Sequence, residues 1–343
     1  MRLSGRDLRN KLKLVMIRSL YKESKNTMSD KNALQVIFGT GPVGMAIMDA
    51  LTDKGYRNIR MINRSGKGMF PSQVELVTGD AMDKNFARKA GEGASVIFFA
   101  LNPAYNKWLD LFPTLQENVL ESAAGAGAKL IVMENVYMYG ITDGKPMTED
   151  TPYNAHTRKG KLRAEMHQQL MEAHQQGRVR VASARASDFV GPRVLESAMG
   201  ERVIYNALAG KAASILGKAD MPHTYTYMPD IGKGMVILAE RDEALGQAWH
   251  IPTDKTLTTQ AFIEKIYAKI GNKTKIASAP KFILHILGIF NPVVREVIEM
   301  IYQFEEPFTV DHSKFVTAFG NIATPIDEVI DATVAWYKDH PKV

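Results

Sequence analysis

Short, largely apolar runs recur along the first half of the chain and alternate with stretches of helical periodicity. The runs span residues 36–38, 58–62, 74–77, 95–100, 129–133 and 178–182. Short apolar runs bounded by turn residues are typical of strands that are buried on both faces of a parallel sheet. The stretch 109–124, between the fourth and fifth runs, is expected to be a helix. Strands that alternate with helices in this way predict an α/β fold with a doubly wound parallel sheet and right-handed crossovers.

The first apolar run leads directly into a glycine-rich turn. This turn reads Gly39-Thr40-Gly41-Pro42-Val43-Gly44 and is followed by a helical pattern. At this spacing the first glycine permits a tight turn, the second leaves the backbone bare, and the third lets the helix pack against the strand. Free N–H groups and the positive end of the helix dipole then face the ligand. We therefore expect the pyrophosphate of a dinucleotide to bind at these six residues.

The alternation of strands and helices ends near residue 190. Turn-rich stretches such as Gly191-Pro192 then separate short helices. We expect residues 31–190 to form the dinucleotide-binding domain and residues 191–343 to form mainly a smaller substrate lobe, with segments that return to the first domain. Glycine, asparagine, proline and charged residues interrupt the apolar stretch 281–304, so it is expected to form bent core helices or a wall of the substrate pocket.

The basic charge is concentrated at the start of the chain. The net charge is +6, and residues 1–30 hold eight basic and three acidic side chains, which is +5 of that total. The remaining residues carry only +1, so the sequence predicts no nucleic-acid partner. We expect residues 1–30 to be a basic N-terminal extension that is dispensable for chemistry.

The composition excludes several classes of site. The chain has no cysteine, which removes disulfides, thiolate zinc sites and cysteine nucleophiles. The absence of cysteine fits a reducing compartment, and we expect a cytoplasmic protein without a metal site. No run of about 18 apolar residues is present, so no membrane span is expected. The sequence leaves a homodimer open.

Several further motifs follow the glycine turn in a recognisable order. They are Gly79-Asp80, Tyr139-Gly140, residues 159–165 (KGKLRAE), residues 185–192 (RASDFVGP), Tyr227-Met228-Pro229-Asp230 and Ala335-Trp336-Tyr337. With these motifs, over residues 33–338, the chain resembles the extended short-chain dehydrogenase/reductases of the NAD-dependent epimerase/dehydratase family. The resemblance implies a Rossmann-like domain with a smaller C-terminal substrate lobe, a nicotinamide cofactor and a small-molecule substrate.

The resemblance fails at the two residues that handle protons in this family. There, a serine follows the fifth strand, and a tyrosine stands four residues before a lysine on the next helix. Lys161 matches the lysine, which implies a contact with the cofactor ribose, but Thr157 replaces the tyrosine and Asn135 replaces the serine. An aliphatic hydroxyl has a pKa far above the roughly 10 of a phenol, so Thr157 is a poor catalytic acid. Tyr137 follows the fifth strand, and we expect the Lys161 ammonium to acidify its phenol for catalysis.

Two neighbouring residues are weaker candidates for proton transfer. Tyr139 closes the Tyr-Gly turn, which favours a structural role. His156 lies in a loop beside Thr157 and titrates in the right range, but a solvated loop histidine is the simpler interpretation.

Cofactor choice depends on the residues after the second strand. Sites that select NAD place Asp or Glu there to bind the ribose hydroxyls. This chain has Asn63-Arg64, so no carboxylate repels a 2′-phosphate and a guanidinium can pair with one. We therefore expect NADP, with NAD as the alternative. Further cofactor contacts are expected after the third and fourth strands, at Asp80, Ala81, Ala100, Leu101 and Asn102.

Candidate substrate contacts are aromatic and basic. Tyr105 and Trp108 are three residues apart, so they share one face of a helical turn and either line the substrate or fill the core. Tyr137 is a candidate for the same role, and Arg193 and His223 lie in positions that resemble the family's substrate-facing loops. No group of converging arginines indicates a sugar-nucleotide clamp, which leaves the substrate open.

These features favour an NADP-dependent oxidoreductase or an epimerase/dehydratase-like enzyme that acts on a small carbonyl or hydroxyl compound. The alternative is a non-catalytic NADP(H)-binding sensor or scaffold. Loss of the usual tyrosine and serine favours the sensor, whereas the retained lysine and the motifs of the pocket favour the enzyme.

Overall fold

The structure, a computed structural model, describes residues 30–279 and 292–342. Residues 1–29, which make up almost all of the predicted extension, lie outside this part of the chain. Residues 280–291 also lie outside it, so the predicted pocket wall is described only from residue 292 onward.

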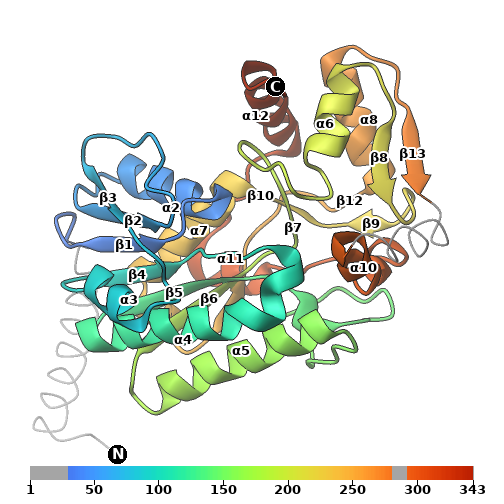
Figure 1. The fold of residues 1–343 in the computed structure, drawn as a ribbon. Helices are drawn as coiled ribbons and strands as arrows, with labels where there is room; N and C mark the ends of the chain where they lie inside the picture. Colours follow the sequence, from blue (N-terminus) through green and yellow to red (C-terminus); the bar gives the residue numbers. More distant parts are fainter. Residues whose placement is uncertain (1–29, 280–291, 343) are drawn as a thin grey trace, which may run out of the picture. The chain divides into compact units, whose positions relative to one another are not determined.

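A seven-stranded sheet lies between two layers of helices (Figure 1), and its strands follow the order β11-β6-β5-β4-β1-β2-β3. Every neighbouring pair of strands is parallel. The strands are β1 (Gln35–Phe38), β2 (Ile59–Asn63), β3 (Val74–Thr78), β4 (Val96–Phe99), β5 (Lys129–Glu134), β6 (Arg180–Arg185) and β11 (Ala248–His250). The predicted fold class, a doubly wound Rossmann-like parallel sheet, is confirmed.

The strand order reverses between β1 and β4. The chain runs outward from β1 to β3 and then crosses back to place β4 on the other side of β1. In open parallel sheets, ligands bind at the carboxyl ends of the strands at such a reversal. All six predicted runs coincide with strands, whereas β11 was not predicted. Its three residues form too short a run to stand out in the sequence.

Helices cover both faces of the sheet (Figure 1). One face carries α2 (Pro42–Asp53), α7 (Met228–Glu240) and α11 (Ser313–Phe319), and the other carries α3 (Lys84–Ala90), α4 (Trp108–Ala126) and α5 (Arg158–Gln175). Successive side chains of a strand point to opposite faces. Accordingly, Ile37 packs in the core beneath α2 and α7, whereas Val36 and Phe38 pack in the core beneath α3, α4 and α5. Burial on both faces explains why the strands are apolar throughout.

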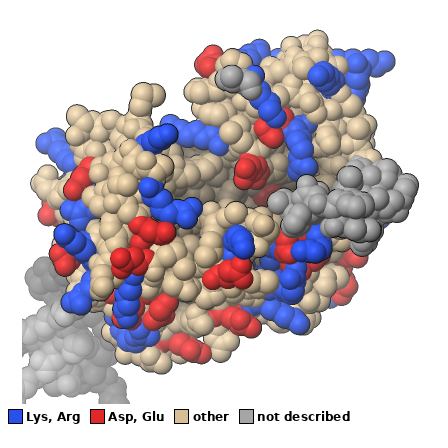
Figure 2. Space-filling view, viewed as in Figure 1, with Lys and Arg blue, Asp and Glu red and all other residues tan. Residues whose placement is uncertain are grey.

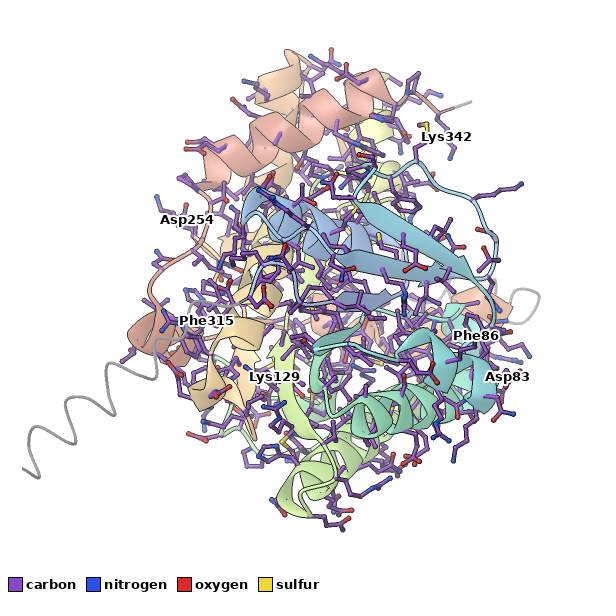
Figure 3. All side chains as sticks on the ribbon, turned by 90° about the vertical axis from the view of Figure 1, so that its left-hand side faces the viewer. Asp83, Phe86, Lys129, Asp254, Phe315 and Lys342 are labelled. Carbon is purple, nitrogen blue, oxygen red and sulfur yellow. The ribbon has the colours of Figure 1, made fainter. Side chains whose placement is uncertain are left out.

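Local sequence determines where some of these helices begin and end. The Asp83 side chain accepts hydrogen bonds from the backbone N–H groups of Asn85 and Phe86 at the start of α3 (Figure 3). This cap satisfies amides that lack an intrahelical partner. Helix α4 ends at Gly127, whose φ of 64° is left-handed, a conformation that glycine adopts at little cost.

The chain beyond β6 adds elements to the sheet and also forms a separate apolar core away from it. Helices α7 and α11 and strand β11 join the sheet, whereas Val203, Phe262 and Ile330 belong to a separate apolar core. The other elements are β7 (Asp188–Val190), α6 (Glu201–Leu208), β8 (Ala213–Leu216), β9 (Pro222–His223), β10 (Tyr225–Tyr227), β12 (Leu257–Thr258), α8 (Thr259–Ile270), β13 (Ile276–Ala279), α10 (Pro292–Ile298) and α12 (Ile326–Asp339). Within the described ranges, no helix combines the length and apolar character that a membrane span requires.

A glycine allows α2 and α7 to pack closely. A Cβ atom at Gly232 of α7 would lie 2.2 Å from the carbonyl oxygen of Ala46 in α2. That separation is far below van der Waals contact, so any side chain at this position forces the helices apart. Gly125 in α4 is different, because it is exposed and a Cβ there would meet nothing within 4 Å.

These two glycines predict opposite effects of the same substitution. Gly232→Ala should lower the free energy of unfolding by about 1–3 kcal/mol through overpacking. Gly125→Ala should raise it by about 0.4–1 kcal/mol, because alanine loses less backbone entropy in a helix. Urea unfolding monitored by circular dichroism measures both values. Equal effects of the two substitutions would contradict the close packing of α2 and α7.

Candidate functional site

Two glycines of the turn after β1 are required by packing. Gly39 has a φ of 113°, and a Cβ there would lie 2.6 Å from the carbonyl oxygen of Ala100, at the end of β4. A Cβ at Gly44 would lie 2.0 Å from the carbonyl oxygen of Gly39. Any side chain at either position would therefore push the turn away from β4 or from the first turn of α2.

The middle glycine of the turn has no such packing reason. A Cβ at Gly41 would meet nothing within 4 Å, so the backbone there faces open space. Gly41 is also the N-cap of the 12-residue helix α2, and it provides no side-chain acceptor for the first amides. These amides and the positive end of the helix dipole attract an anion. The turn lies where the strand order reverses, so the residues present fit a dinucleotide pyrophosphate.

Asn63, the last residue of β2, organises the loop beside the glycine turn. Its Nδ2 donates to Thr40 Oγ1 at 3.1 Å and to the Lys67 carbonyl oxygen at 2.8 Å. Its Oδ1 accepts from the Gly66 backbone N–H at 2.8 Å. The loop therefore folds back toward the turn, and the Arg64 side chain remains exposed.

The ends of β3 and β4 present the other predicted cofactor contacts. Asp80 is exposed, and Ala81 beneath it is buried at 3% exposure. Sequence reasoning missed Asn118 of α4, whose Nδ2 donates to the carbonyl oxygens of Ala81 and Met82. A buried amide in a helix has no distinctive sequence signal. After β4, Ala100 is buried, Leu101 is half-buried and Asn102 is exposed.

Three aromatic rings gather after β4 and β5. Tyr105 begins the short helix η1 (Tyr105–Lys107), and its ring meets that of Trp108 edge-on at 4.9 Å. Trp108 also stacks on Tyr137 of η2 (Tyr137–Tyr139), with centroids 6.0 Å apart. Trp108 is 6% exposed and packs in the core, whereas Tyr105 and Tyr137 are half-buried. The predicted shared face of Tyr105 and Trp108 is present, with only Tyr105 accessible to a ligand.

The predicted catalytic helix has a different arrangement from the one that the resemblance implies. Thr157 is the N-cap of α5, and its Oγ1 accepts from the Gly160 backbone N–H at 3.1 Å. Its hydroxyl therefore serves the helix end. Lys161, in the first turn of α5, is exposed. Its predicted contact with the cofactor ribose stays a prediction.

A different lysine of the same turn is buried at the site. Lys159 is 1% exposed, and its Nζ lies 4.5 Å from the centroid of the Tyr105 ring. The same ammonium forms ion pairs with Glu296 and Glu299, the latter at 3.2 Å. Sequence reasoning missed it because the family motif points to Lys161 and because a lysine is seldom buried unless it is paired. The ion pairs fasten the described part of the predicted pocket wall to α5, beside Tyr105.

The expected acidification of Tyr137 is wrong. Burial raises the pKa of Tyr137, and the negative charge of Asp188 raises it further. The nearby Arg163 guanidinium lowers this pKa, but too little to reverse the shift. Lys161 is not among the charges that act on this phenol. At neutral pH Tyr137 is therefore a neutral phenol that donates or accepts hydrogen bonds.

The other residues of the turn after β5 are engaged with the protein itself. Asn135 Oδ1 accepts from the Tyr137 backbone N–H at 3.2 Å. The Tyr139 side chain is fully buried, and its hydroxyl lies 2.7 Å from His250 Nε2 and accepts from Arg185 at 2.6 Å. His156 is exposed and meets the Tyr302 ring edge-on at 4.9 Å. Tyr139 therefore has the structural role that was favoured for it.

Buried charges hold the carboxyl ends of β5 and β6 together. Glu134 accepts from Arg185 Nε at 3.0 Å and lies 3.0 Å from His167 Nδ1. Burial alone would raise the pKa of Glu134, but the charges of His167 and Arg185 outweigh it and lower this pKa to about 2. Glu134 and Arg185 are both at most 1% exposed. They belong to the framework of the site and are out of a ligand's reach.

Two predicted substrate contacts are already engaged with other residues. The Arg193 guanidinium pairs with Asp49 of α2 at 2.6 Å, so it binds α2, and the expected contact with substrate would require breaking this pair. His223 is 2% exposed, and its Nε2 lies 2.7 Å from Asp188 Oδ2. The accessible member of that pair is Asp188, with 18% of its side chain exposed.

Figure 2 shows a hollow between the helices α2 and α7 and the group formed by α6 and α8. Acidic side chains lie within this hollow, and basic side chains lie along its margins.

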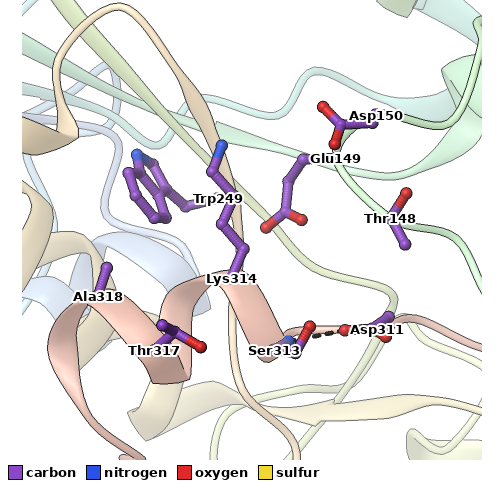
Figure 4. A pocket seen from close by; sticks show the side chains of 9 residues that line it. All are labelled: Thr148, Glu149, Asp150, Trp249, Asp311, Ser313, Lys314, Thr317 and Ala318. Carbon is purple, nitrogen blue, oxygen red and sulfur yellow. Dashed lines mark hydrogen bonds between the residues drawn. The ribbon is translucent and has the colours of Figure 1, made fainter.

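A separate cavity of about 400 Å³ lies elsewhere, beside the edge strand β11 (Figure 4). Trp249, Lys314 and Glu149 are among its lining residues, but no predicted site residue lines it. We therefore place the site at the strand reversal.

The chain is similar to proteins of known families. The model of the NAD dependent epimerase/dehydratase family matches residues 36–251. A curated relative, the 3beta-hydroxysteroid-dehydrogenase/decarboxylase isoform 2 of Arabidopsis thaliana, is 22% identical over an alignment of 272 residues, gaps included, and the match covers 71% of this chain. The match covers only 44% of that relative, so the chain spans less than half of its length.

Solved structures share the fold over nearly the whole chain. The UDP-N-acetylglucosamine 4-epimerase from Methanobrevibacter ruminantium has a TM-score of 0.74 at 16% identity, over 90% of this chain and 99% of that one. The UDP-glucuronic acid 4-epimerase from Bacillus cereus, solved with NAD, has a TM-score of 0.73 at 16% identity with the same coverage. At such low identity the likeness shows the fold alone.

The contrast between the two lysines of α5 can be measured. Lys159→Met removes the buried partner of Glu296 and Glu299, which keep their ion pairs with Arg158, and it should lower the free energy of unfolding by about 1–3 kcal/mol. Lys161→Met removes an exposed side chain and should change it by less than about 0.5 kcal/mol. Urea unfolding of the two variants compares them. A larger loss of stability in Lys161→Met than in Lys159→Met would contradict the burial of Lys159.

The pKa of Glu134 predicts a loss of stability in acid. The pKa falls from 4.5 in the unfolded chain to about 2 in the folded protein, so its contribution is complete above pH 4.5 and is lost as the pH falls toward 2. The loss should be on the order of 3 kcal/mol. Glu134→Gln should be less stable at pH 7 but should lose less stability across this window. Urea unfolding at several pH values tests this, and parallel curves for the two proteins would contradict it.

Proposed function

This chain belongs to the NAD dependent epimerase/dehydratase family, and on that premise we propose that it is an oxidoreductase or epimerase-like enzyme that uses a nicotinamide dinucleotide. The observation that carries the proposal is the bare N-terminus of α2 at Gly41. It lies at the strand reversal and faces open space. Packing accounts for Gly39 and Gly44 but not for Gly41, and a bound pyrophosphate would account for a glycine there.

A bound nicotinamide dinucleotide supplies or accepts a hydride. In the proposed arrangement, the N–H groups of the first turn of α2 hold the pyrophosphate, and Ala100 and Leu101 lie under the dinucleotide at the end of β4. The loop that Asn63 organises lies beside the adenosine ribose. Asp80 and Asn102, which are exposed after β3 and β4, are further proposed contacts. Lys161 remains our proposed contact for the other ribose.

We infer a preference for NADP over NAD from the end of β2. The carboxylate that binds both ribose hydroxyls in NAD sites is replaced by Asn63, whose side chain is occupied within its own loop. The exposed Arg64 guanidinium that follows it is available to a 2′-phosphate. The solved B. cereus relative binds NAD, so NAD remains the alternative.

The substrate end of the proposed site lies after β4 and β5. Tyr105 and Tyr137 are half-buried there, next to the segment that Lys159 fastens through Glu296 and Glu299. As a neutral phenol, Tyr137 suits a hydrogen bond to a substrate oxygen. The names of the relatives, a hydroxysteroid dehydrogenase and sugar 4-epimerases, support chemistry at a carbon that bears oxygen. We therefore propose a small carbonyl or hydroxyl compound as the substrate.

Isothermal titration calorimetry with NADPH and NADH tests the cofactor. NADPH should bind more tightly, and Arg64→Ala should weaken NADPH about tenfold or more by removing one charge-assisted phosphate contact. Its effect on NADH should be small. Gly41→Val should weaken both dinucleotides alike, because a side chain there occupies the pyrophosphate site. Unchanged binding in Gly41→Val would contradict the site, and an unchanged NADPH/NADH ratio in Arg64→Ala would contradict only the NADP preference.

Steady-state kinetics of Tyr137→Phe test the role of this phenol. Loss of one neutral hydrogen bond should lower kcat/KM by about fivefold to tenfold and leave dinucleotide affinity unchanged. A loss of about 10²–10⁴-fold would instead show that Tyr137 is the catalytic acid, as the sequence led us to expect. Tight dinucleotide binding without turnover of any carbonyl or hydroxyl compound would favour the sensor.

A further inference from the structure

Asp188 and His223 form a pair next to the aromatic residues of the proposed site. Asp188 is the first residue of β7, and His223 is the last residue of β9. His223 Nε2 lies 2.7 Å from Asp188 Oδ2, and its Nδ1 lies 3.2 Å from the carbonyl oxygen of Gln303. Both ring nitrogens are therefore directed at oxygen atoms.

The number of protons in this pair follows from these two contacts. A carbonyl oxygen only accepts hydrogen bonds, so His223 Nδ1 carries a proton. A carboxylate oxygen also only accepts, so the contact between Nε2 and Asp188 requires a second proton between them. The pair thus holds one proton more than a neutral imidazole beside a carboxylate.

His250 provides an internal comparison. Its Nδ1 also faces a carbonyl oxygen, that of Asp311, at 2.7 Å. Its Nε2, however, meets the hydroxyl of Tyr139, which can donate. Burial lowers the pKa of His250 to about 3, which agrees with a neutral ring that needs no second proton. The carboxylate partner is what distinguishes His223.

Aromatic rings surround His223, so solvent reaches the pair mainly at Asp188. The rings of Tyr225, Phe304 and Phe308 stack against His223 at centroid distances of 4.6, 5.1 and 5.2 Å. Aromatic faces also favour a cation. His223 is 2% exposed, whereas 18% of the Asp188 side chain is exposed. A proton therefore enters or leaves the pair through Asp188.

Asp188 lies close to the proposed substrate end of the site. Its charge acts on both Tyr137 and Tyr105, since it raises the pKa of each phenol beyond the effect of burial. Gln303 of the segment η4 (Ile301–Phe304), whose carbonyl oxygen meets His223 Nδ1, also forms a hydrogen bond with the Tyr137 side chain. The Tyr302 hydroxyl of the same segment is buried, and within the part of the chain that the structure describes it has no hydrogen-bond partner. Buried polar atoms without partners are expected where a polar ligand binds.

We propose that Asp188, with the proton that it shares with His223, is the catalytic acid that replaces the missing tyrosine. This inference rests on the proposed function. In the reduction of a carbonyl compound, the shared proton moves from His223 Nε2 to Asp188, Asp188 passes it to the carbonyl oxygen, and the carbonyl carbon gains a hydride from the reduced dinucleotide. The products are an alcohol, the oxidised dinucleotide and a pair with one proton fewer, which solvent restores. Because the pair already carries this proton before substrate binds, it can supply the proton that reduction of a carbonyl group requires.

Nitrogen-15 NMR of the labelled full-length chain counts the protons on His223 at pH 7. The spectrum of His223→Gln assigns the His223 signals among those of the eight histidines. Wild-type protein should show both ring nitrogens protonated. Asp188→Asn should show only one, because the new amide can donate to Nε2. The same single protonation in both proteins overturns the proposal, whatever the cofactor.

Turnover of a panel of aldehydes and ketones with NADPH and NADH tests the catalytic use of this proton. Asp188→Asn should lower turnover by about 10²–10⁴-fold, the range for loss of a general acid, with dinucleotide affinity unchanged. Asp327→Asn is the matched control, because it removes an exposed carboxylate that pairs with Lys265. Its turnover should equal that of the wild type.

The outcomes separate this proposal from the proposed function. Dinucleotide binding and turnover that persist unchanged in Asp188→Asn overturn the catalytic acid alone. A wild-type chain that binds neither dinucleotide overturns the proposed function, and this proposal with it. A chain that binds the dinucleotide but reduces no carbonyl compound favours the sensor and also overturns the acid.

Discussion

The proposed site depends on the close approach of the turn after β1 to the end of β4. Gly39 lies against the carbonyl group of Ala100, and Gly44 lies against the carbonyl group of Gly39. These two contacts bring the start of α2 directly over the point where the strand order reverses. Without them the helix N-terminus would not face the crevice, and its dipole could not act on a bound anion. The other residues of the site are arranged around this geometry.

Buried charge organises the rest of the carboxyl edge of the sheet. Glu134, Arg185 and His167 are bonded to one another beneath the site, and the ion pairs of Lys159 lie beside it. Buried ions of this kind add little net stability, but each becomes costly when its partner is lost. They therefore tie together segments that are far apart in sequence. The position of the pocket wall from residue 292 onward relative to Tyr105 depends on such a tie.

The proposed site has groups that can hold a proton, although the chain has Thr157 where the family resemblance implies a tyrosine. Thr157 is a helix cap, and burial keeps Tyr137 neutral. The pair of Asp188 and His223 comes from other strands and has a hydrogen-bonding pattern that requires a shared proton. In our proposal, the proton donor therefore lies in a different part of the crevice from the glycine turn. Substrate chemistry and cofactor binding are separable on this fold.

The sequence alone determined the fold class, six of the seven strands and the glycine turn. These features are local, because apolar runs and glycine spacing are written in consecutive residues. Tertiary structure decided which of two lysines, 159 or 161, is buried, because the two are separated only by the register of α5 against its neighbours. It also decided that Arg193 pairs with Asp49 and that His223 pairs with Asp188. Such pairings join residues that are distant in the chain, and no local pattern encodes them. The environment of a titratable group, and therefore its chemistry, arises only when the chain is folded.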